Sequence, residues 1–449
     1  MAIFLESGFP HPLRSFGMTA SAKLVIVYAT LYGMKLHHEL FDVIVVGGGA
    51  SGMMAAGQAA QRGKKVLLLE KNRRLGEKLL ITGGGRCNIT NEEYDVPAFL
   101  SHYGDSADFL YSPFHQFGVL NTFVFFESLG ILLVVQARNR VFPKTERAVD
   151  VCNALAENMQ KHGVIIKTNC IVKKVNQNGR EIVNVETNQG VLSAKSFIFS
   201  TGGVSHPETG STGDGFKWLR ALGHSVKDPT PTIVPLSVAD EWVKALSGVS
   251  LSFMKITIFL EGKKQFAKIG KVLFTHFGLS GPLILNIAGG VGDLLEDGVV
   301  TAAIDTYPDT NLGDMDKKVV NLFNLMKNSD LKTAFKELAP EGTAGALQGV
   351  LPQIDFNKKV HSVTRDERKL IVNTLKALPV TITGLMGNDM AVSADGGVEL
   401  SEVDTRTMRS KLIDNLYITG DLLHINKPSG GYSLQLCWTT GFVAGNAVI

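Results

Sequence analysis

Residues 42–91 read DVIVVGGGASGMMAAGQAAQRGKKVLLLEKNRRLGEKLLITGGGRCNITN, and this stretch decides the fold. It opens with a short apolar run, Val43 to Val46, that is rich in β-branched residues and predicts a buried strand. A glycine cluster follows from Gly47 to Gly52, and then an Ala- and Met-rich segment of good helix formers. The order predicts a buried parallel strand, a tight turn and a helix.

The glycine cluster has the spacing of a dinucleotide-binding turn. Gly47 permits the turn, Gly49 lets the backbone approach a pyrophosphate, and Gly52 lets helix and strand pack closely. Ala50 and Ser51 complete the turn, where the unpaired N–H groups at the helix start attract phosphate. A second strand, Lys65 to Leu69, ends at Glu70, whose carboxylate is placed to accept the hydroxyl groups of an unphosphorylated ribose. An ordinary glycine turn is the alternative, and the strand, helix and acid around the motif argue against it.

A second glycine run follows Glu70. Gly83, Gly84 and Gly85 cannot pack a core, so we expect them to bring backbone close to the same pyrophosphate or to the ring system of a larger cofactor. Arg86 is placed to pair with a phosphate or an acidic substrate, with a surface ion pair as the alternative, and Asn88 offers a neutral hydrogen bond. Further candidates for the cofactor in this segment are Lys71, Lys78 and Cys87, although a small packed thiol is the more common role for such a cysteine.

Composition sets broad limits. The chain has 449 residues, long enough for two or three domains, and its 45 basic and 42 acidic residues give a net charge of only +3, which does not suggest a nucleic-acid partner. The four cysteines show no C-x-x-C pair and no metal-ligand spacing, so we expect no metal and a reducing, cytoplasmic location. Residues 1–41 read as an N-terminal extension, from an upstream start codon or as a loosely attached arm. Their apolar run is too short to span a membrane, and an export signal is the less favoured reading.

Two later segments of the chain are also expected to contact the cofactor. A buried strand, Ser196 to Phe199, leads into Thr201, Gly202 and Gly203, and His206 follows as a residue that faces the cofactor or lies in an ordinary loop. Near the C-terminus a strand ends in Gly420 and Asp421, where the carboxylate suits a hydroxylated linker such as ribitol. Gly430, Gly431 and Tyr432 then start a helix whose N-terminus suits a ring carbonyl that gains negative charge on reduction.

Between these segments the pattern changes. Residues 232–305 predict strands, and residues 314–378 predict amphipathic helices. In the β-rich part, Ser280 as N-cap and Pro282 near the first turn predict a helix start. His276 just before it is a candidate substrate contact, with an ordinary loop histidine as the alternative. An Asn178-Gly179 turn predicts a hairpin between strands near Gly163–Lys167 and Glu181–Glu186.

Several longer segments resemble the BaiN-like flavoproteins, which are also described as aminoacetone-oxidase-like FAD enzymes. The matching segments are VVGGGASGMMAA, LLEKNRRLGEKLLITGGGRCNITN, STGGVSHPETGSTGDGF, LFTHFGLSGP, GGVELSEVD and NLYITGDLLHINKPSGGYSLQLCWTTGFVAG. The resemblance implies an α/β fold in which a Rossmann-like FAD domain of the glutathione-reductase type is interrupted by a β-barrel-like domain and a small helical domain. We therefore expect an FAD-binding domain from residues 42–230 plus 380–449, a β-rich insert at 231–310 and a helical insert at 311–379.

The resemblance also implies function. By it, the FAD contacts fall on Gly47, Gly49, Gly52, Glu70, Gly84, Arg86, Gly420, Asp421, Gly430 and Gly431. This sequence departs from the family pattern close to the flavin: Asp421 stands where Glu is common, His424 where Asp is common, and Ser433 where Asn is frequent. The implied activity is hydride transfer between FAD and a small organic substrate, either reduction of a conjugated C=C bond or oxidation of an amine.

Two alternatives stay open at this stage, a flavin-dependent RNA-modifying enzyme and a non-catalytic flavin-binding protein. No second nucleotide fingerprint follows a strand, so NAD(P)H is expected only as a transient reductant. The catalytic residue is not identified, and its candidates are His206, His276 and Arg86. The oligomeric state is not predicted.

Overall fold

The computed structural model describes residues 40–387 and 393–449; the predicted N-terminal extension lies almost entirely outside the described residues. A five-stranded sheet with the strand order β19-β10-β1-β2-β6 forms the centre of the first part, and all of its strand pairs are parallel. Its strands are β1 (Phe41–Val46), β2 (Val66–Leu69), β6 (Ile165–Lys167), β10 (Ala194–Phe199) and β19 (Leu416–Ile418). Strands β1, β2 and β19 are almost wholly buried, as their continuous apolar runs predict.

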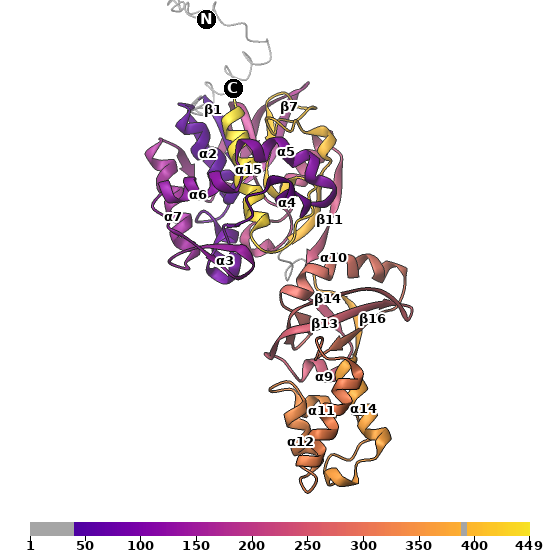
Figure 1. Ribbon diagram of the computed structural model, residues 1–449. Helices are drawn as coiled ribbons and strands as arrows, with labels where there is room; N and C mark the ends of the chain where they lie inside the picture. The colour runs from indigo at the N-terminus through magenta and orange to yellow at the C-terminus, as the bar shows by residue number, and fades with distance from the viewer. Residues whose placement is uncertain (1–39, 388–392) are drawn as a thin grey trace, which may run out of the picture. The chain divides into compact units, whose positions relative to one another are not determined.

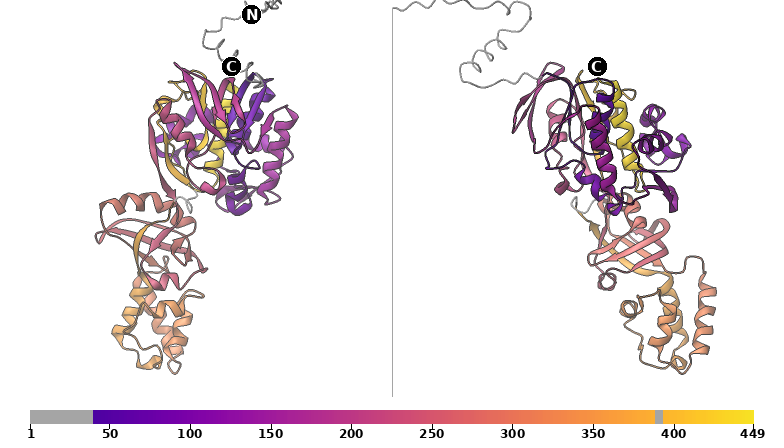
Figure 2. Two further views of the ribbon diagram at one scale, coloured as in Figure 1. Left: turned by 180° about the vertical axis from the view of Figure 1, so that it is seen from behind. Right: turned by 90° about the vertical axis from the view of Figure 1, so that its left-hand side faces the viewer.

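Helix α2 (Ala50–Gln61) follows β1, and α15 (Tyr432–Ala447), the last helix of the chain, packs along it (Figure 1). Glycines allow this close approach: a Cβ at Gly441 would lie 2.4 Å from the Ser51 carbonyl oxygen, and one at Gly445 would lie 2.4 Å from that of Ala55. Helix α2 and the last helix of the chain therefore build one layer together. A three-stranded sheet, β7 (Val172–Asn178), β8 (Glu181–Thr187) and β9 (Gly190–Leu192), lies on the other side of the parallel sheet (Figure 2, right).

The remaining elements of this part surround that core. The helices are α3 (Glu77–Gly85), α4 (Val96–Ser101), α5 (Ala107–Gln116), α6 (Val119–Ser128), α7 (Ala148–Lys161) and α8 (Asp214–Ala221). A small antiparallel sheet consists of β3 (Thr90–Asn91), β4 (Leu133–Gln136) and β5 (Arg140–Pro143). The core aromatic residues include Trp438 of α15, which donates a hydrogen bond to the Ile89 carbonyl oxygen (2.9 Å) just before β3.

The middle of the chain forms a closed antiparallel barrel with the strand order β12-β15-β14-β13-β16-β17. Its strands are β12 (Leu236–Val238), β13 (Ser250–Leu260), β14 (Lys263–Thr275), β15 (Gly278–Ser280), β16 (Val300–Asp305) and β17 (Leu378–Leu385). The helices of the inserted part are α9 (Glu241–Lys244), α10 (Pro282–Asp297), α11 (Leu312–Leu325), α12 (Leu331–Leu338), α13 (Ala344–Gln348) and α14 (Arg365–Lys376). The predicted barrel and helical inserts are therefore both present.

Two antiparallel strands, β11 (Val226–Ile233) and β18 (Ser393–Val398), join the sheet part to the barrel part. The hydrophobic cores divide accordingly: residues 234–382 form one cluster, and residues on either side of that range form another. Strand β17 closes the barrel, so residues 380–385 pack with the insert and not with the FAD domain to which the sequence analysis assigns them. We propose domain boundaries that follow these two cores.

Two local predictions are wrong in detail. The Asn178-Gly179 turn does form a hairpin, but β8 pairs with β7, whereas residues 165–167 pair with β2 in the parallel sheet. An Asn-Gly turn joins strands that are adjacent in sequence, and Gly163–Lys167 lies too far upstream for that. Helix α10 has Gly281 as its N-cap at φ 92°, because Ser280 is already paired in β15; Pro282 is its first residue, as predicted.

No helix in residues 40–387 and 393–449 has the length and apolarity that a bilayer crossing requires.

Candidate active site

A cavity of about 840 Å³ opens at the carboxyl ends of the parallel strands, where ligands bind in open α/β sheets. Its walls come from segments far apart in sequence: the turn before α2, residues 69–91, residues 200–211 and the start of α15. Barrel residues Pro282, Leu285 and Asn286 of α10 also line it. The cavity therefore brings together most of the motifs identified from the sequence.

The glycine turn has the geometry that its spacing predicts. Gly47 has φ 106°, a conformation that favours glycine. A Cβ at Gly52 would lie 1.9 Å from the Gly47 carbonyl oxygen, so helix and strand pack too closely there for any residue but glycine. A Cβ at Gly49 would meet nothing within 4 Å, because this residue faces the open cavity. The turn thus leaves room for a phosphate beside the first N–H groups of α2.

Glu70 lies at the end of β2 and is almost completely buried. Its carboxylate accepts hydrogen bonds from the backbone N–H groups of Gly48 (2.7 Å) and Asn72 (2.8 Å). Burial raises its pKa, and these two hydrogen bonds oppose that effect. The side chain therefore fixes both loops while it lines the cavity, where its remaining lone pairs face a ligand.

The second glycine run interrupts α3. Gly83 and Gly84 have φ 58° and 68°, and a Cβ at Gly84 would again meet open space. Cys87 follows at φ 63° but is fully buried and does not line the cavity, and burial raises the pKa of its thiol to about 12. It is therefore a packed thiol and not a reactive one. The Asn88 side-chain amide is oriented so that both its nitrogen and its oxygen form hydrogen bonds, and the oxygen accepts from the Gly431 N–H (2.9 Å).

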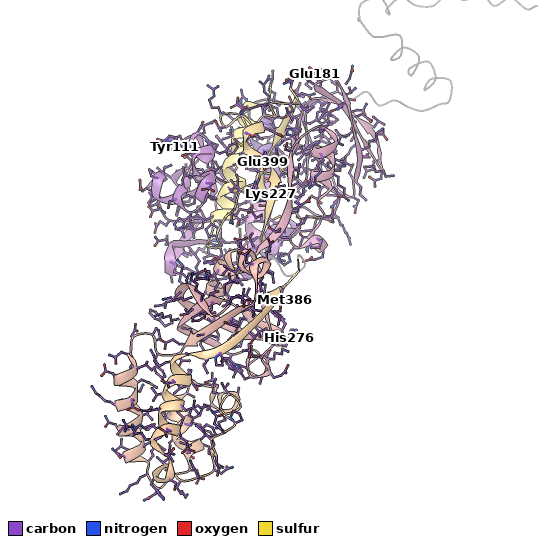
Figure 3. All side chains as sticks on the ribbon, turned by 90° about the vertical axis from the view of Figure 1, so that its right-hand side faces the viewer. Tyr111, Glu181, Lys227, His276, Met386 and Glu399 are labelled. Carbon is purple, nitrogen blue, oxygen red and sulfur yellow. The ribbon has the colours of Figure 1, made fainter. Side chains whose placement is uncertain are left out.

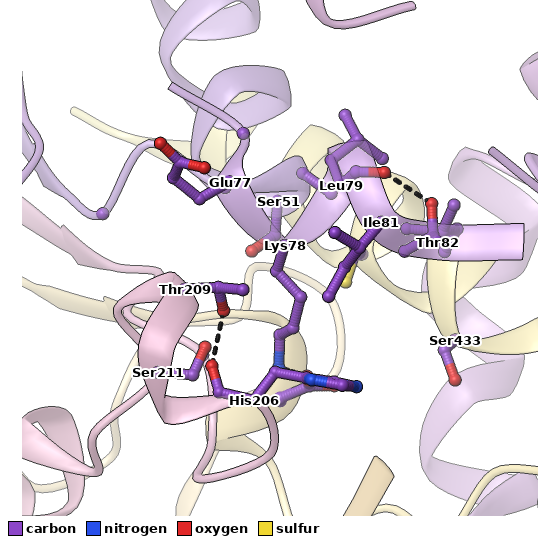
Figure 4. Close-up of a pocket in the computed structure, with 18 of the residues that line it drawn as sticks. Ser51, Glu77, Lys78, Leu79, Ile81, Thr82, His206, Thr209, Ser211 and Ser433 are labelled. Carbon is purple, nitrogen blue, oxygen red and sulfur yellow. Dashed lines mark hydrogen bonds and ion pairs between the residues drawn. The ribbon is translucent and has the colours of Figure 1, made fainter. Parts of the chain in front are cut away.

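Asp421 lies on the cavity wall and forms ion pairs with two lysines. One carboxylate oxygen lies 3.3 Å from Lys78 Nζ, and the other lies 3.0 Å from Lys427 Nζ. Burial opposes ionisation of Asp421, but the two lysines more than offset it and hold its pKa well below the ordinary value. Lys78 reaches toward the 206–211 loop in Figure 4 and also donates to Ser205 Oγ (2.9 Å).

The start of α15 differs from the prediction in one respect. The Gly431 N–H does not face the cavity freely, because it donates to Asn88. Gly431 has φ 105°, and a Cβ there would lie 2.3 Å from the backbone carbon and oxygen of Thr90. Position 431 must therefore be glycine so that the helix start can contact β3. The N–H groups that the helix start leaves free are the next ones, from Tyr432 onward. The Tyr432 ring itself packs against Phe99 at 4.9 Å between centroids.

The three candidate catalytic residues do not all lie in the cavity wall: Arg86 and His206 line it, and His276 does not. Arg86 lines the cavity and stacks over the Phe142 ring at 4.2 Å. His206 also lines it, at φ 53° (Figure 4). Its Nδ1 lies 2.8 Å from Glu208 Oε1. His276 is exposed in the turn between β14 and β15 and does not line the cavity (Figure 3). The structure therefore does not support His276 as a substrate contact in this cavity.

Most of the predicted cofactor residues share the cavity wall. Those that line it are Gly47, Gly49, Ala50, Ser51, Glu70, Lys71, Lys78, Gly84, Arg86, Asn88, Thr201, Gly202, Asp421, Gly430, Gly431 and Tyr432. Those behind it are Gly52, Cys87, Gly203 and Gly420. No role is predicted from the sequence for Lys427, Arg138, Arg140 or Asn286. The alternating arginines of Arg138-Asn139-Arg140 offered a signal for two of these, but nothing in the sequence indicated that Lys427 would be buried beside Asp421.

The wall fits a flavin dinucleotide. Two side-chain oxygens of wall residues, Thr201 Oγ1 and Asp421 Oδ1, are buried and have no hydrogen-bond partner within the described residues. Gly49 and Gly84 leave open space where any side chain would intrude. Glu70 and Asp421, the residues expected beside the ribose and the polyhydroxyl linker, both line the cavity.

A protein family described as "HI0933-like protein Rossmann domain" matches residues 41–447. The chain is 28% identical over 379 residues to a 3-dehydro-bile acid delta(4,6)-reductase of Clostridium scindens. This alignment covers 84% of this chain and 91% of that protein. It is 26% identical over 389 residues to a ribosomal RNA dihydrouridine synthase of Haemophilus influenzae, with coverage of 84% and 91%.

Among solved structures, the open conformation of a flavocytochrome c3 fumarate reductase matches with a TM-score of 0.52 and 16% identity, covering 99% of this chain and 84% of that chain. At this identity the likeness concerns the fold alone.

Proposed function

The chain belongs to the HI0933-like Rossmann-domain family and is an FAD-dependent oxidoreductase, and within that class we propose that it reduces a carbon–carbon double bond conjugated to a carbonyl group in a small organic molecule. One observation carries the proposal: the cavity continues from the nucleotide-binding turn past the start of α15 to Pro282, Leu285 and Asn286 of the barrel part. This leaves a wall beyond the expected flavin position against which a substrate can lie.

The two relatives favour this reaction over amine oxidation. One is named as a reductase of delta(4,6) bonds in a 3-dehydro-bile acid, and the other as a synthase of dihydrouridine. Dihydrouridine differs from uridine by two hydrogens across a ring double bond next to a carbonyl, so both named products imply the same type of bond. We propose a small molecule as substrate because the net charge of +3 offers little for RNA.

Bound FAD supplies hydride transfer, and the chain supplies position and charge. Asp421, kept ionised by Lys78 and Lys427, would accept a hydrogen bond from a hydroxyl group of the linker. The free N–H groups from Tyr432 onward stabilise negative charge near the start of α15. His206, oriented by Glu208, is the proposed proton donor to the substrate carbon, since its ring lies on the cavity wall.

Two finer points are also proposals. A further glycine cluster, Gly289-Gly290-Val291-Gly292, lies inside α10 and not after a strand, so NAD(P)H would dock transiently as the reductant. All four cysteines are free, which agrees with a reducing compartment such as the cytoplasm.

The purified protein is expected to be yellow and to release FAD and not FMN on denaturation. Glu70 and the turn from Gly47 to Gly52 are adenosine and pyrophosphate features that FMN would not use. Because no matching motif contains a known attachment residue, acid precipitation is expected to leave the colour in the supernatant. Mass spectrometry of the released cofactor decides the question, and a pure FMN or nicotinamide signal would contradict the assignment.

The reaction is tested by reducing the FAD-loaded protein under anaerobic conditions and mixing it with a 3-oxo-4,6-diene steroid acid. We expect the flavin to be reoxidised and the steroid to gain two hydrogen atoms, as seen by mass spectrometry. His276→Ala serves as the control, because this residue lies outside the cavity, and it should react at the same rate. Formation of dihydrouridine in added ribosomal RNA without steroid reduction would instead favour the RNA-modifying alternative, and no reoxidation by either would favour a non-catalytic flavoprotein.

A further inference from the structure

Three arginines converge on one end of the cavity. Arg86 follows α3, whereas Arg138 and Arg140 lie before and at the start of β5, and all three side chains line the cavity. The Phe142 ring lies near two of them, with its centroid 4.2 Å from the Arg86 guanidinium and 5.8 Å from that of Arg140. The ring gives both guanidinium groups a flat apolar surface to lie on.

The positive charge of this arginine cluster is poorly compensated. Glu146 lies 3.5 Å from Arg86 and is half exposed. Within the described part of the chain, neither Arg138 nor Arg140 forms an ion pair with a carboxylate; Arg140 donates only to the Ala137 carbonyl oxygen (3.1 Å). Burial lowers the pKa of Arg140, and the charges of Arg86 and Arg138 add to that effect. Like charges held this close are unfavourable unless an anion joins them.

The cluster lies at the α15 end of the cavity and not at the nucleotide turn. The Asn91 side-chain amide donates to the carbonyl oxygens of both Arg138 (3.1 Å) and Gly430 (3.3 Å), which joins the arginine segment to the residues just before α15. Arg138 and Asn139 have φ 64° and 56°, a strained conformation for residues with side chains. The FAD phosphates are expected beside α2 and Glu70, so Arg138 and Arg140 are not needed for them, although the resemblance counts Arg86 among the FAD contacts.

We propose that Arg86, Arg138 and Arg140 form a subsite for an oxyanion of the substrate, most simply a carboxylate. The inference rests on the proposed function in that the bound molecule is the one that FAD reduces. A carboxylate fits the paired N–H groups of a guanidinium, and the ordered arginines hold the substrate with its double bond toward the flavin. The substrate class is therefore a conjugated carbonyl compound with an acidic group at a distance from the reacting bond.

Two probes test the subsite on the FAD-loaded protein. The first is inorganic sulfate, whose binding is followed by the change in the visible flavin spectrum and by calorimetry. The second is a matched pair, a 3-oxo-4,6-diene steroid acid and its methyl ester, which share the double bonds and differ in charge. The variants are Arg138→Gln and Arg140→Gln. The control is Arg147→Gln, because Arg147 is exposed, pairs with Asp150 and does not line the cavity.

Sulfate is expected to bind saturably, with a Kd raised about threefold by Arg138→Gln, which is exposed, and about tenfold by Arg140→Gln, which is half-buried. The same variants should raise KM for the acid and leave KM for the ester unchanged, and Arg147→Gln should change neither. Arg138→Lys should restore part of the sulfate affinity. Sulfate binding that is absent or insensitive to both arginines overturns the subsite. Sulfate binding without turnover of the acid or the ester would leave the subsite standing and contradict the proposed function instead.

Discussion

Replacing Gly431 by valine is expected to destabilise the FAD-binding part and to slow flavin reduction about a hundredfold. The new Cβ would lie 2.3 Å from the Thr90 backbone, and valine strongly disfavours φ 105°. The backbone strain and the overlap each cost about 1–3 kcal/mol. Strand β3 must move away, which breaks the Asn88 contact with Gly431 and shifts the start of α15. Thermal unfolding and stopped-flow reduction by dithionite at matched FAD occupancy measure the two effects.

Gly430→Val is the matched control. Gly430 has φ 119°, so it carries the same backbone cost, but its Cβ would meet only the Tyr432 ring, at 3.5 Å. It should therefore lose less stability than Gly431→Val. Equal losses in the two variants would show that the contact with Thr90 is unimportant, and normal reduction kinetics in Gly431→Val would mean that the start of α15 does not act on the flavin.

Replacing Asp421 by alanine is expected to cost about 3–5 kcal/mol of folding free energy, because it leaves two ammonium groups without their shared carboxylate. The uncompensated charge costs more at Lys427 than at Lys78, because the Lys427 side chain is only 2% exposed. A second change, Lys427→Met, should recover part of the loss by removing that uncompensated charge. Chemical unfolding of the two single variants and the double variant gives the coupling energy. Additive losses would contradict the ion pair.

The same group predicts a pH dependence. The pKa of Asp421 is lower in the folded protein than its ordinary value of 3.8. A depressed carboxyl pKa stabilises the fold fully above the unfolded value, and the contribution is lost as the pH falls below it. The wild-type protein should therefore lose stability below about pH 4, and Asp421→Ala should lose less over that range.

The sequence predicted the fold well wherever a local pattern has one physical meaning. The strand, glycine turn, helix and Glu70 could be located without coordinates because each requires a particular residue at a particular spacing. The barrel and the helical insert were also recognised. The first strand of the β7–β8 hairpin was missed because Val172–Asn178 is polar and exposed, so it lacks the apolar run used to find strands.

The candidate site was less predictable where it depends on distant segments. Arg138 and Arg140 join Arg86 only because β5 pairs with β3, a register that is not visible in the sequence. Lys427 and Lys78 meet Asp421 from either side, although they lie 349 positions apart in the printed numbering. The sequence could not decide between the two alternatives for His276: it precedes a helix that lines the cavity, but its own side chain is exposed and does not line the cavity.

The packing of α15 on α2 also has a consequence for the newly made chain. Residues 62–431 separate these helices, so α2 emerges from the ribosome long before its partner exists. At roughly 5–20 residues per second the wait is on the order of tens of seconds. Met53 and Met54 of α2, which are buried in the finished protein, have no complete layer to cover them during that time. The barrel is contiguous in sequence and can close first, so the part that binds the nucleotide, although it begins earlier, is the last to be completed.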